Sequence, residues 1–441
     1  MIRKTLTFFI LMAALCALPL ALAAQDGSAK PTYTLAEYDA YKACEGETNP
    51  QARVKCLDSF VSAYPASTLL PYAFRIYYTT YAQLKDSNKK VVEYADKMLA
   101  LGTEKVDAST RLEAAYTGTT HFYGAYNAKA PEAEKSKDLN AALSRARTGL
   151  EIVGGLKKPE SVTDEQFAAN LKQLRAIFHH AVGYASLELK DYAGAKAGFT
   201  STLENNPADG LAYFRMGVAH LQSTPPEHLD GFWALAKSVS LKGPGEAQVR
   251  RYLRNQLVAY QQPSCEVSID PQMNELLALA GGTATRPEGY SIPAAAELDK
   301  ARADVATFIA DLKGGGDKAK ITWLALCNSE FPELGGKVFE VSEAGDTVVV
   351  KLYIGPSQEE IEASTEPNSE LKITGQPEAK RLKKDGLLKF SGTLSGYEPE
   401  PFLLSWDKVK VEAEFIPAEE APAKAPTKRP AKRPAKRPPA R

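Results

Sequence analysis

The feature that most restricts the fold of this chain is a pattern that recurs after 34 residues. Gly183 and Gly217 are 34 residues apart, and Ala195, Phe199 and Pro207 follow the first of them. Small residues such as Gly183 and Ala195 let two antiparallel helices approach closely, while Phe199 fills the space between one hairpin and the next. Pro207 ends the second helix, because it has no amide hydrogen and its ring clashes with the preceding turn. The pattern therefore predicts successive helical hairpins.

These residues resemble the tetratricopeptide repeat, whose 34-residue units each form a helix–turn–helix. The other matching positions are His179, Val182 and Ser186 in the first copy and Tyr213, Met216 and His220 in the second. The resemblance implies about five hairpins, which Glu246–Tyr260 closes as a polar capping helix.

Repeats of this family bind extended peptides on a concave surface formed by the first helix of each hairpin. The resemblance assigns six residues of this chain to such a surface: His180, Tyr184, Leu187, Phe214, Val218 and Leu221. The aromatic residues Tyr77, Tyr78 and Tyr81 are candidates to extend it. The alternative is that some of these side chains pack against the second helices instead.

The whole chain of 441 residues is predicted to be an α + β multidomain protein, an α-helical TPR-like solenoid followed by a small all-β domain and a disordered tail. Five segments are expected: a signal peptide over 1–24, a helical repeat domain over 25–262, a helical connector over 263–335, a β domain over 336–416 and a basic tail over 417–441.

The β domain is indicated by a change of hydrophobic period to two after Lys337. Such alternation is typical of half-buried strands. Five strands are expected, over 338–341, 348–354, 371–374, 387–394 and 402–411, and they suit either a small barrel or a sandwich. The phrase LKKDGLLKFSGTLSGY resembles the fourth-strand region of bacterial OB-like domains.

The two ends of the chain have compositions unlike the rest. Arg3 and Lys4 precede an apolar run that Pro19 interrupts before Ala21-Leu22-Ala23, as in a secretory signal. A retained membrane anchor is the alternative. The segment 417–441 holds seven prolines and eight Lys or Arg, so it cannot bury a core and is predicted to be disordered. The body between the two ends is acidic.

Export would leave four cysteines in the mature chain, Cys44, Cys56, Cys265 and Cys327. An even number in an oxidising compartment indicates disulfides. Three pairings are possible, and Cys44–Cys56 with Cys265–Cys327 is the most local. Free buried thiols are the alternative. The spacings lack the short pairs typical of zinc sites.

The sequence contains no HExxH, P-loop or GxSxG motif. His179 and His180 are adjacent on a helix, so their side chains diverge by about 100° and do not suit a shared metal ion. We therefore expect no cofactor, no metal and no enzyme activity. The predicted function is a periplasmic or secreted scaffold that binds a protein or peptide partner in envelope assembly or secretion. The alternative is a binder of anionic cell-wall or nucleic-acid polymers through the tail and the β domain.

Overall fold

The computed structural model describes residues 32–243 and 245–419, and these form two compact units. The first unit runs to Gln256 and also includes Met273–Ser291, whereas the second comprises Leu257–Gln272 and the residues from Ile292 onward. With these boundaries the chain passes between the units three times. The predicted signal peptide and nearly all of the predicted basic tail lie outside the described residues.

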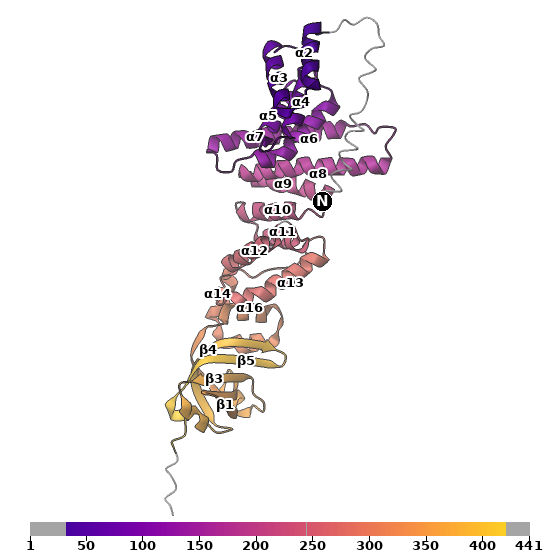
Figure 1. The fold of residues 1–441 in the computed structure, drawn as a ribbon. Helices are drawn as coiled ribbons and strands as arrows, with labels where there is room; N and C mark the ends of the chain where they lie inside the picture. Colours follow the sequence, from indigo (N-terminus) through magenta and orange to yellow (C-terminus); the bar gives the residue numbers. More distant parts are fainter. Residues whose placement is uncertain (1–31, 244, 420–441) are drawn as a thin grey trace, which may run out of the picture. The chain divides into compact units, whose positions relative to one another are not determined.

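The first unit consists of helices (Figure 1). Each of them packs chiefly on the helices next to it in sequence. They are α2 (Leu35–Gly46), α3 (Pro50–Ala63), α4 (Leu70–Tyr81), α5 (Asn88–Ala100), α6 (Ala108–Ala125), α7 (Glu132–Gly155), α8 (Asp164–Glu188), α9 (Tyr192–Asn205), α10 (Gly210–Gln222) and α11 (His228–Ser240). Two further helices, α12 (Glu246–Gln261) and α13 (Ile269–Gly282), begin in one unit and end in the other.

Side-chain caps fix where several of these helices begin. Asn49 accepts a hydrogen bond from Ala52 N at 3.0 Å, and Pro50 occupies the first turn of α3, as the sequence predicts. Thr163 forms a capping box with Gln166 at the start of α8. The helix boundaries thus follow from local chemistry that is visible in the sequence.

Helices α8 and α9 pack closely at a pair of glycines. A Cβ atom on Gly183 would lie 2.8 Å from the Phe199 ring, and one on Gly198 would lie 2.6 Å from the Gly183 backbone nitrogen. Ala195 and Phe199 are fully buried, and they form one apolar cluster with Ala212 of α10. The predicted roles of Gly183, Ala195 and Phe199 in close packing are confirmed by these contacts.

The N-terminal part of the first unit has an aromatic core. Tyr77 and Tyr78 are buried in it, and the Tyr77 ring stacks on Tyr94 with centroids 3.9 Å apart. The suggestion that Tyr77 and Tyr78 extend a binding surface is therefore wrong, because both rings fill the interior. Helical period alone does not distinguish an aromatic that packs inward from one that faces a partner.

The second unit begins with short helices. They are α14 (Ala295–Ala303), the 3-10 turn η3 (Val305–Thr307), α15 (Phe308–Gly314) and α16 (Gly316–Leu326). Within the predicted helical connector, the apolar residues Leu298, Val305, Phe308 and Ile309 predict one continuous helix over 294–312. This prediction is wrong, because η3 interrupts the helix. The β-branched Val305 and Thr307 disfavour helix at the break. The turn directs Phe308 against Phe331 and Trp406.

The strands of the second unit form a closed five-stranded barrel in the order β1-β2-β3-β5-β4. They are β1 (Glu330–Ala344), β2 (Thr347–Ile354), β3 (Ser369–Thr374), β4 (Leu387–Pro399) and β5 (Phe402–Val411). Only β3 and β5 pair in parallel. Trp406 is fully buried inside the barrel with Phe390. The five predicted strands are confirmed, and closure rules out the sandwich.

The four cysteines lie in two pairs at disulfide distance. The Cα atoms of Cys44 and Cys56 are 5.3 Å apart, and those of Cys265 and Cys327 are 5.7 Å apart. This is the most local of the three possible pairings. Two disulfides fit an oxidising, exported environment.

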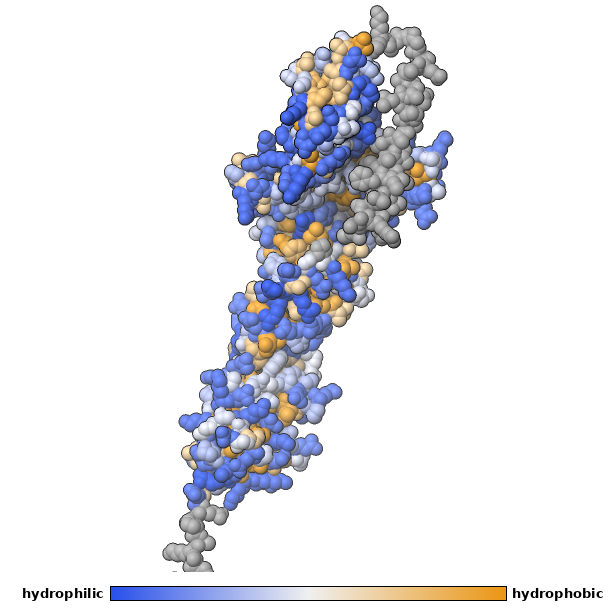
Figure 2. All heavy atoms as spheres, viewed as in Figure 1, coloured by the Kyte–Doolittle hydropathy of each residue, from blue (hydrophilic) through white to orange (hydrophobic). Residues whose placement is uncertain are grey.

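On the face drawn in Figure 2, apolar residues lie in small patches among hydrophilic ones. Among the described helices, none has the length and apolar content needed to span a bilayer.

Candidate functional site

Three alternate helices of the first unit, α6, α8 and α10, bring aromatic and cationic side chains together at one place. Tyr123 lies near the end of α6, His180 and Tyr184 lie one helical turn apart on α8, and Arg215 lies on α10. We call these four residues the Tyr–His–Arg cluster. Because α6, α8 and α10 are each separated by one intervening helix, the cluster joins equivalent faces of three hairpins.

The cluster is held by two hydrogen bonds and by ring contacts. Tyr123 Oη lies 2.9 Å from His180 Nδ1, and Arg215 Nη1 lies 3.2 Å from His180 Nε2. The Arg215 guanidinium lies over the Tyr184 ring, 4.3 Å from its centroid. Such stacking stabilises a guanidinium that is partly removed from water.

Burial and charge perturb the titratable groups of the cluster. Burial lowers the pKa of His180 to about 4, and the Arg215 charge acts in the same direction. Burial raises the pKa of Tyr123 and that of Tyr184 to about 12. At neutral pH the cluster therefore contains a neutral imidazole, two neutral phenols and one positive charge.

Arg215 has no carboxylate within ion-pair distance among the residues that the structure describes. The charge of Asp209 acts on His180 and Tyr123, and the Asp209 side chain accepts hydrogen bonds from Leu211 N and Ala212 N at the start of α10. Tyr123 remains 39% exposed. The cluster thus presents an uncompensated positive charge and a phenol hydroxyl to solvent.

The six residues predicted for a concave surface lie in different surroundings. His180 and Tyr184 belong to the cluster, and Phe214 contacts Tyr252 of α12 with ring centroids 6.3 Å apart. Leu187 packs against the buried cluster around Phe199, and Leu221 lies over Gly231 of α11. Val218 is half-buried. The alternative of packing against the second helices thus applies to Leu187 and Leu221.

The sequence analysis missed Tyr123 and Arg215. Tyr116, Tyr123 and Tyr126 recur at spacings that place them on one face of α6, which is the signal that was available. Arg215 directly follows Phe214, and a cation beside an assigned surface residue was a second signal. The less regular hairpin of α6 and α7 obscured the alignment.

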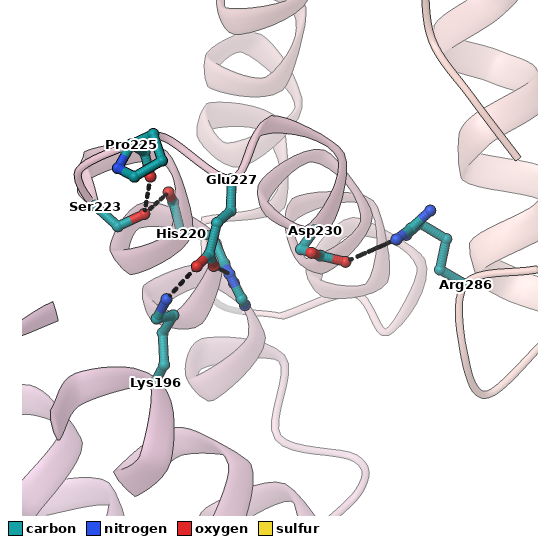
Figure 3. A network of polar contacts seen from close by, with 7 residues as sticks. All are labelled: Lys196, His220, Ser223, Pro225, Glu227, Asp230 and Arg286. Carbon is teal, nitrogen blue, oxygen red and sulfur yellow. Dashed lines mark hydrogen bonds and ion pairs between the residues drawn. The ribbon is translucent and has the colours of Figure 1, made fainter. Parts of the chain in front are cut away.

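A second polar network closes the hairpin of α10 and α11 (Figure 3). Glu227 accepts from Lys196 at 2.6 Å and is in contact with His220 Nδ1. Hydrogen bonds from Lys196 and His220 hold the pKa of the Glu227 carboxyl below its usual range. Ser223 Oγ donates to the carbonyl oxygens of His220 and Pro225. His220, which matches a position of the repeat pattern, therefore lies in a polar network.

Three side chains of this network are the described residues that resemble a set of metal ligands. Ligand atoms of His220, Glu227 and Asp230 all lie within 4.8 Å of one another. However, Lys196 pairs with Glu227, and Arg286 pairs with Asp230 at 3.2 Å. Because both carboxylates already have a cationic partner, the network serves to tie α9, the α10–α11 hairpin and Arg286 together.

A cavity of about 430 Å³ lies between α5, α6 and α7. Its wall includes Arg145, which is 2% exposed and forms a two-pronged ion pair with Asp96 at 2.7 and 2.9 Å. Arg145 also donates to the Gly118 carbonyl oxygen at 3.2 Å. The Arg145 guanidinium is therefore engaged within the fold.

No family model, no curated protein and no solved structure matches this chain.

Proposed function

We propose that this protein is a non-enzymatic scaffold that binds an extended segment of a protein partner along the face formed by α6, α8 and α10. The observation that carries the proposal is the Tyr–His–Arg cluster, in which three hairpins contribute to one exposed site. Rigid aromatic side chains with a polar tip and arginine are the residue types that supply most of the energy at protein interfaces. The scaffold role is assigned to envelope assembly or secretion.

The tetratricopeptide resemblance supports the same proposal. Gly183 and Gly198 make the close contact of α8 with α9, and Gly217 and Gly231 repeat it between α10 and α11. The second hairpin therefore reuses the packing of the first, as expected of a solenoid. A surface built from repeated units offers equivalent contact points along the direction in which an extended peptide runs.

Export is part of the proposal. Cys44–Cys56 and Cys265–Cys327 support an oxidising compartment. A cleaved signal peptide over 1–24 and a periplasmic or extracellular location follow from the sequence of the N-terminus.

The second candidate function, binding of anionic polymers, is favoured by the eight basic residues of the tail. The strand order and the parallel β3–β5 pair support an OB-like barrel. The outer faces of β2 and β3, however, carry charges of both signs: Lys351 is opposite Glu370 in the register and also pairs with Glu340. The barrel thus adds little positive charge there, and this candidate depends on the tail.

Photo-crosslinking in the native host tests the scaffold proposal. A benzoyl-phenylalanine at Tyr123 is expected to form adducts with a small set of proteins. A benzoyl-phenylalanine at Tyr72 is the matched control, because Tyr72 is also an exposed tyrosine on a helix of the first unit, at 45%, but lies outside the cluster.

Adducts at Tyr123 should be absent at Tyr72 and should be lost when Arg215→Glu is added. Identical adducts at both positions, or adducts that are insensitive to Arg215→Glu, would contradict the proposal.

A further inference from the structure

The imidazole of His180 has a hydrogen-bond partner on each of its nitrogens. The partner Arg215 determines which nitrogen accepts and which one donates. Arginine has N–H donors only, so His180 Nε2 must accept from Arg215 Nη1. A neutral imidazole has one acceptor nitrogen and one N–H. Nδ1 therefore carries the hydrogen and donates it to Tyr123 Oη.

The direction of the His180–Tyr123 hydrogen bond determines which further hydrogen bonds the Tyr123 hydroxyl can form. Its oxygen accepts from His180, so its own hydrogen must be donated elsewhere. Arg215 also forms a side-chain hydrogen bond with Tyr123, and because arginine has donors only, this bond too is accepted by the hydroxyl oxygen and leaves its hydrogen unused. Because the side chain is 39% exposed, the hydroxyl hydrogen is available to a molecule that approaches from solvent.

Arg215 offers donors at the same place. His180 and Tyr123 each accept from one of its five N–H groups, and the planar group lies beside the rings of Tyr184 and Tyr123, at 4.3 and 5.6 Å from their centroids. The burial that keeps His180 neutral also strengthens any interaction with the guanidinium. The site therefore combines a phenol donor, guanidinium donors and one positive charge.

We propose that Tyr123 and Arg215 form a donor subsite that holds the carboxylate of an aspartate or glutamate side chain in a bound peptide, with His180 as the residue that orients both donors. The inference rests on the proposed peptide-binding function and adds the chemical class of the bound side chain. A carboxylate suits the site because it accepts from several donors at once and compensates the unpaired charge of Arg215.

The direction of the hydrogen bonds is tested without any ligand. The protein contains five histidines, so labelling with ¹⁵N-histidine gives a small set of signals, and His180→Gln assigns the one from His180. Long-range ¹H–¹⁵N spectra at neutral pH are expected to show the tautomer with hydrogen on Nδ1. The Nε2–H tautomer, or a doubly protonated ring, would overturn the proposal.

The ligand class is tested with two pools of random decapeptides that differ at one central position. One pool has Asp or Glu there, and the other has Asn or Gln. The immobilised full-length protein is expected to retain the acidic pool about tenfold to a hundredfold better, as charge-assisted hydrogen bonds allow. Arg215→Gln should abolish this preference, and Tyr123→Phe should reduce it severalfold.

Tyr126→Phe is the matched control, because Tyr126 is the C-cap residue of the same helix and its ring also contacts Tyr184, with centroids 6.2 Å apart. It should leave the preference unchanged. Equal retention of both pools would overturn the carboxylate subsite and leave peptide binding intact. Retention of neither pool would overturn the proposed function as well.

Discussion

His180 is the residue on which the candidate site depends most directly. It touches Tyr123 of α6 and Arg215 of α10, its ring lies 5.8 Å from that of Phe199 of α9, and the Asp209 charge acts on it from the start of α10. The neighbours that face it thus include one cation and one acid, but burial and Arg215 together favour the neutral ring. This balance gives a pH dependence that can be measured.

We expect the free energy of unfolding to rise with pH between about 4 and 6.5 through His180. The ordinary pKa of an imidazole is 6.5, and the pKa of His180 in the folded protein is about 4. Between these values the unfolded chain binds a proton at His180 that the folded protein does not bind. Urea unfolding at a series of pH values measures the effect. His180→Gln should flatten the dependence in this window, and an unchanged slope would show that the folded ring is protonated as readily as the unfolded one.

Only some residues of this site could be predicted from the sequence. His180 and Tyr184 follow from the glycine that aligns the two repeats, because helical spacing fixes their face relative to Gly183. Tyr123 and Arg215 do not follow, since their role depends on how three helices from different hairpins align. Leu187 and Leu221 have the correct helical phase but face the second helices.

At the scale of elements, the contact of α8 with α9 sets how closely the hairpin packs. The atoms that oppose Gly198 belong to the Gly183 backbone, at 2.6 and 2.7 Å from an added Cβ, and they cannot rotate away as a side chain can. The backbones approach to a distance that only glycine permits.

Gly198→Ala is therefore expected to lower the free energy of unfolding by about 1–3 kcal/mol, the usual cost of overpacking. Gly154→Ala in α7 is the control, because no heavy atom lies within 4 Å of its added Cβ. There alanine should be neutral or stabilise by up to about 1 kcal/mol, since it restricts the unfolded chain. Equal destabilisation by both substitutions in urea would contradict the close contact.

Most elements could be predicted from the sequence because their signals are local. Asn49-Pro50 and Thr163 indicate where helices begin, and the apolar, β-branched run over 348–354 indicates a strand. Closure of the barrel could not be predicted, because it depends on the parallel pairing of β3 with β5, which lie far apart in the chain. The break at Val305 was missed because the hydrophobic period continues through it, whereas the direction of the chain changes to bury Phe308.

At the scale of the whole molecule, the charge of the C-terminal segment predicts an interaction with anionic surfaces. Segment 417–441 holds eight basic residues. When they bind an anionic surface, counterions of that surface are released, which makes binding strongly salt-dependent. We expect the full-length protein to sediment with phosphatidylglycerol vesicles at low salt and to be released as salt rises, whereas the protein truncated to remove 417–441 stays in solution. Phosphatidylcholine vesicles are the control. Equal sedimentation of both proteins with anionic vesicles would exclude the tail as the binding segment.

The order of the cysteines along the chain has a consequence for how the protein is made. Cys44 and Cys56 are 12 residues apart, and Cys265 follows Cys56 after 209 residues. At synthesis rates of about 5–20 residues per second, a chain delivered N-terminus first exposes the first pair for about 10 to 40 s before Cys265 exists. Once these two thiols have reacted with each other, Cys265 can pair only with Cys327. In a chain exported while it is synthesised, oxidation in order of appearance would select one connectivity of three without an isomerase.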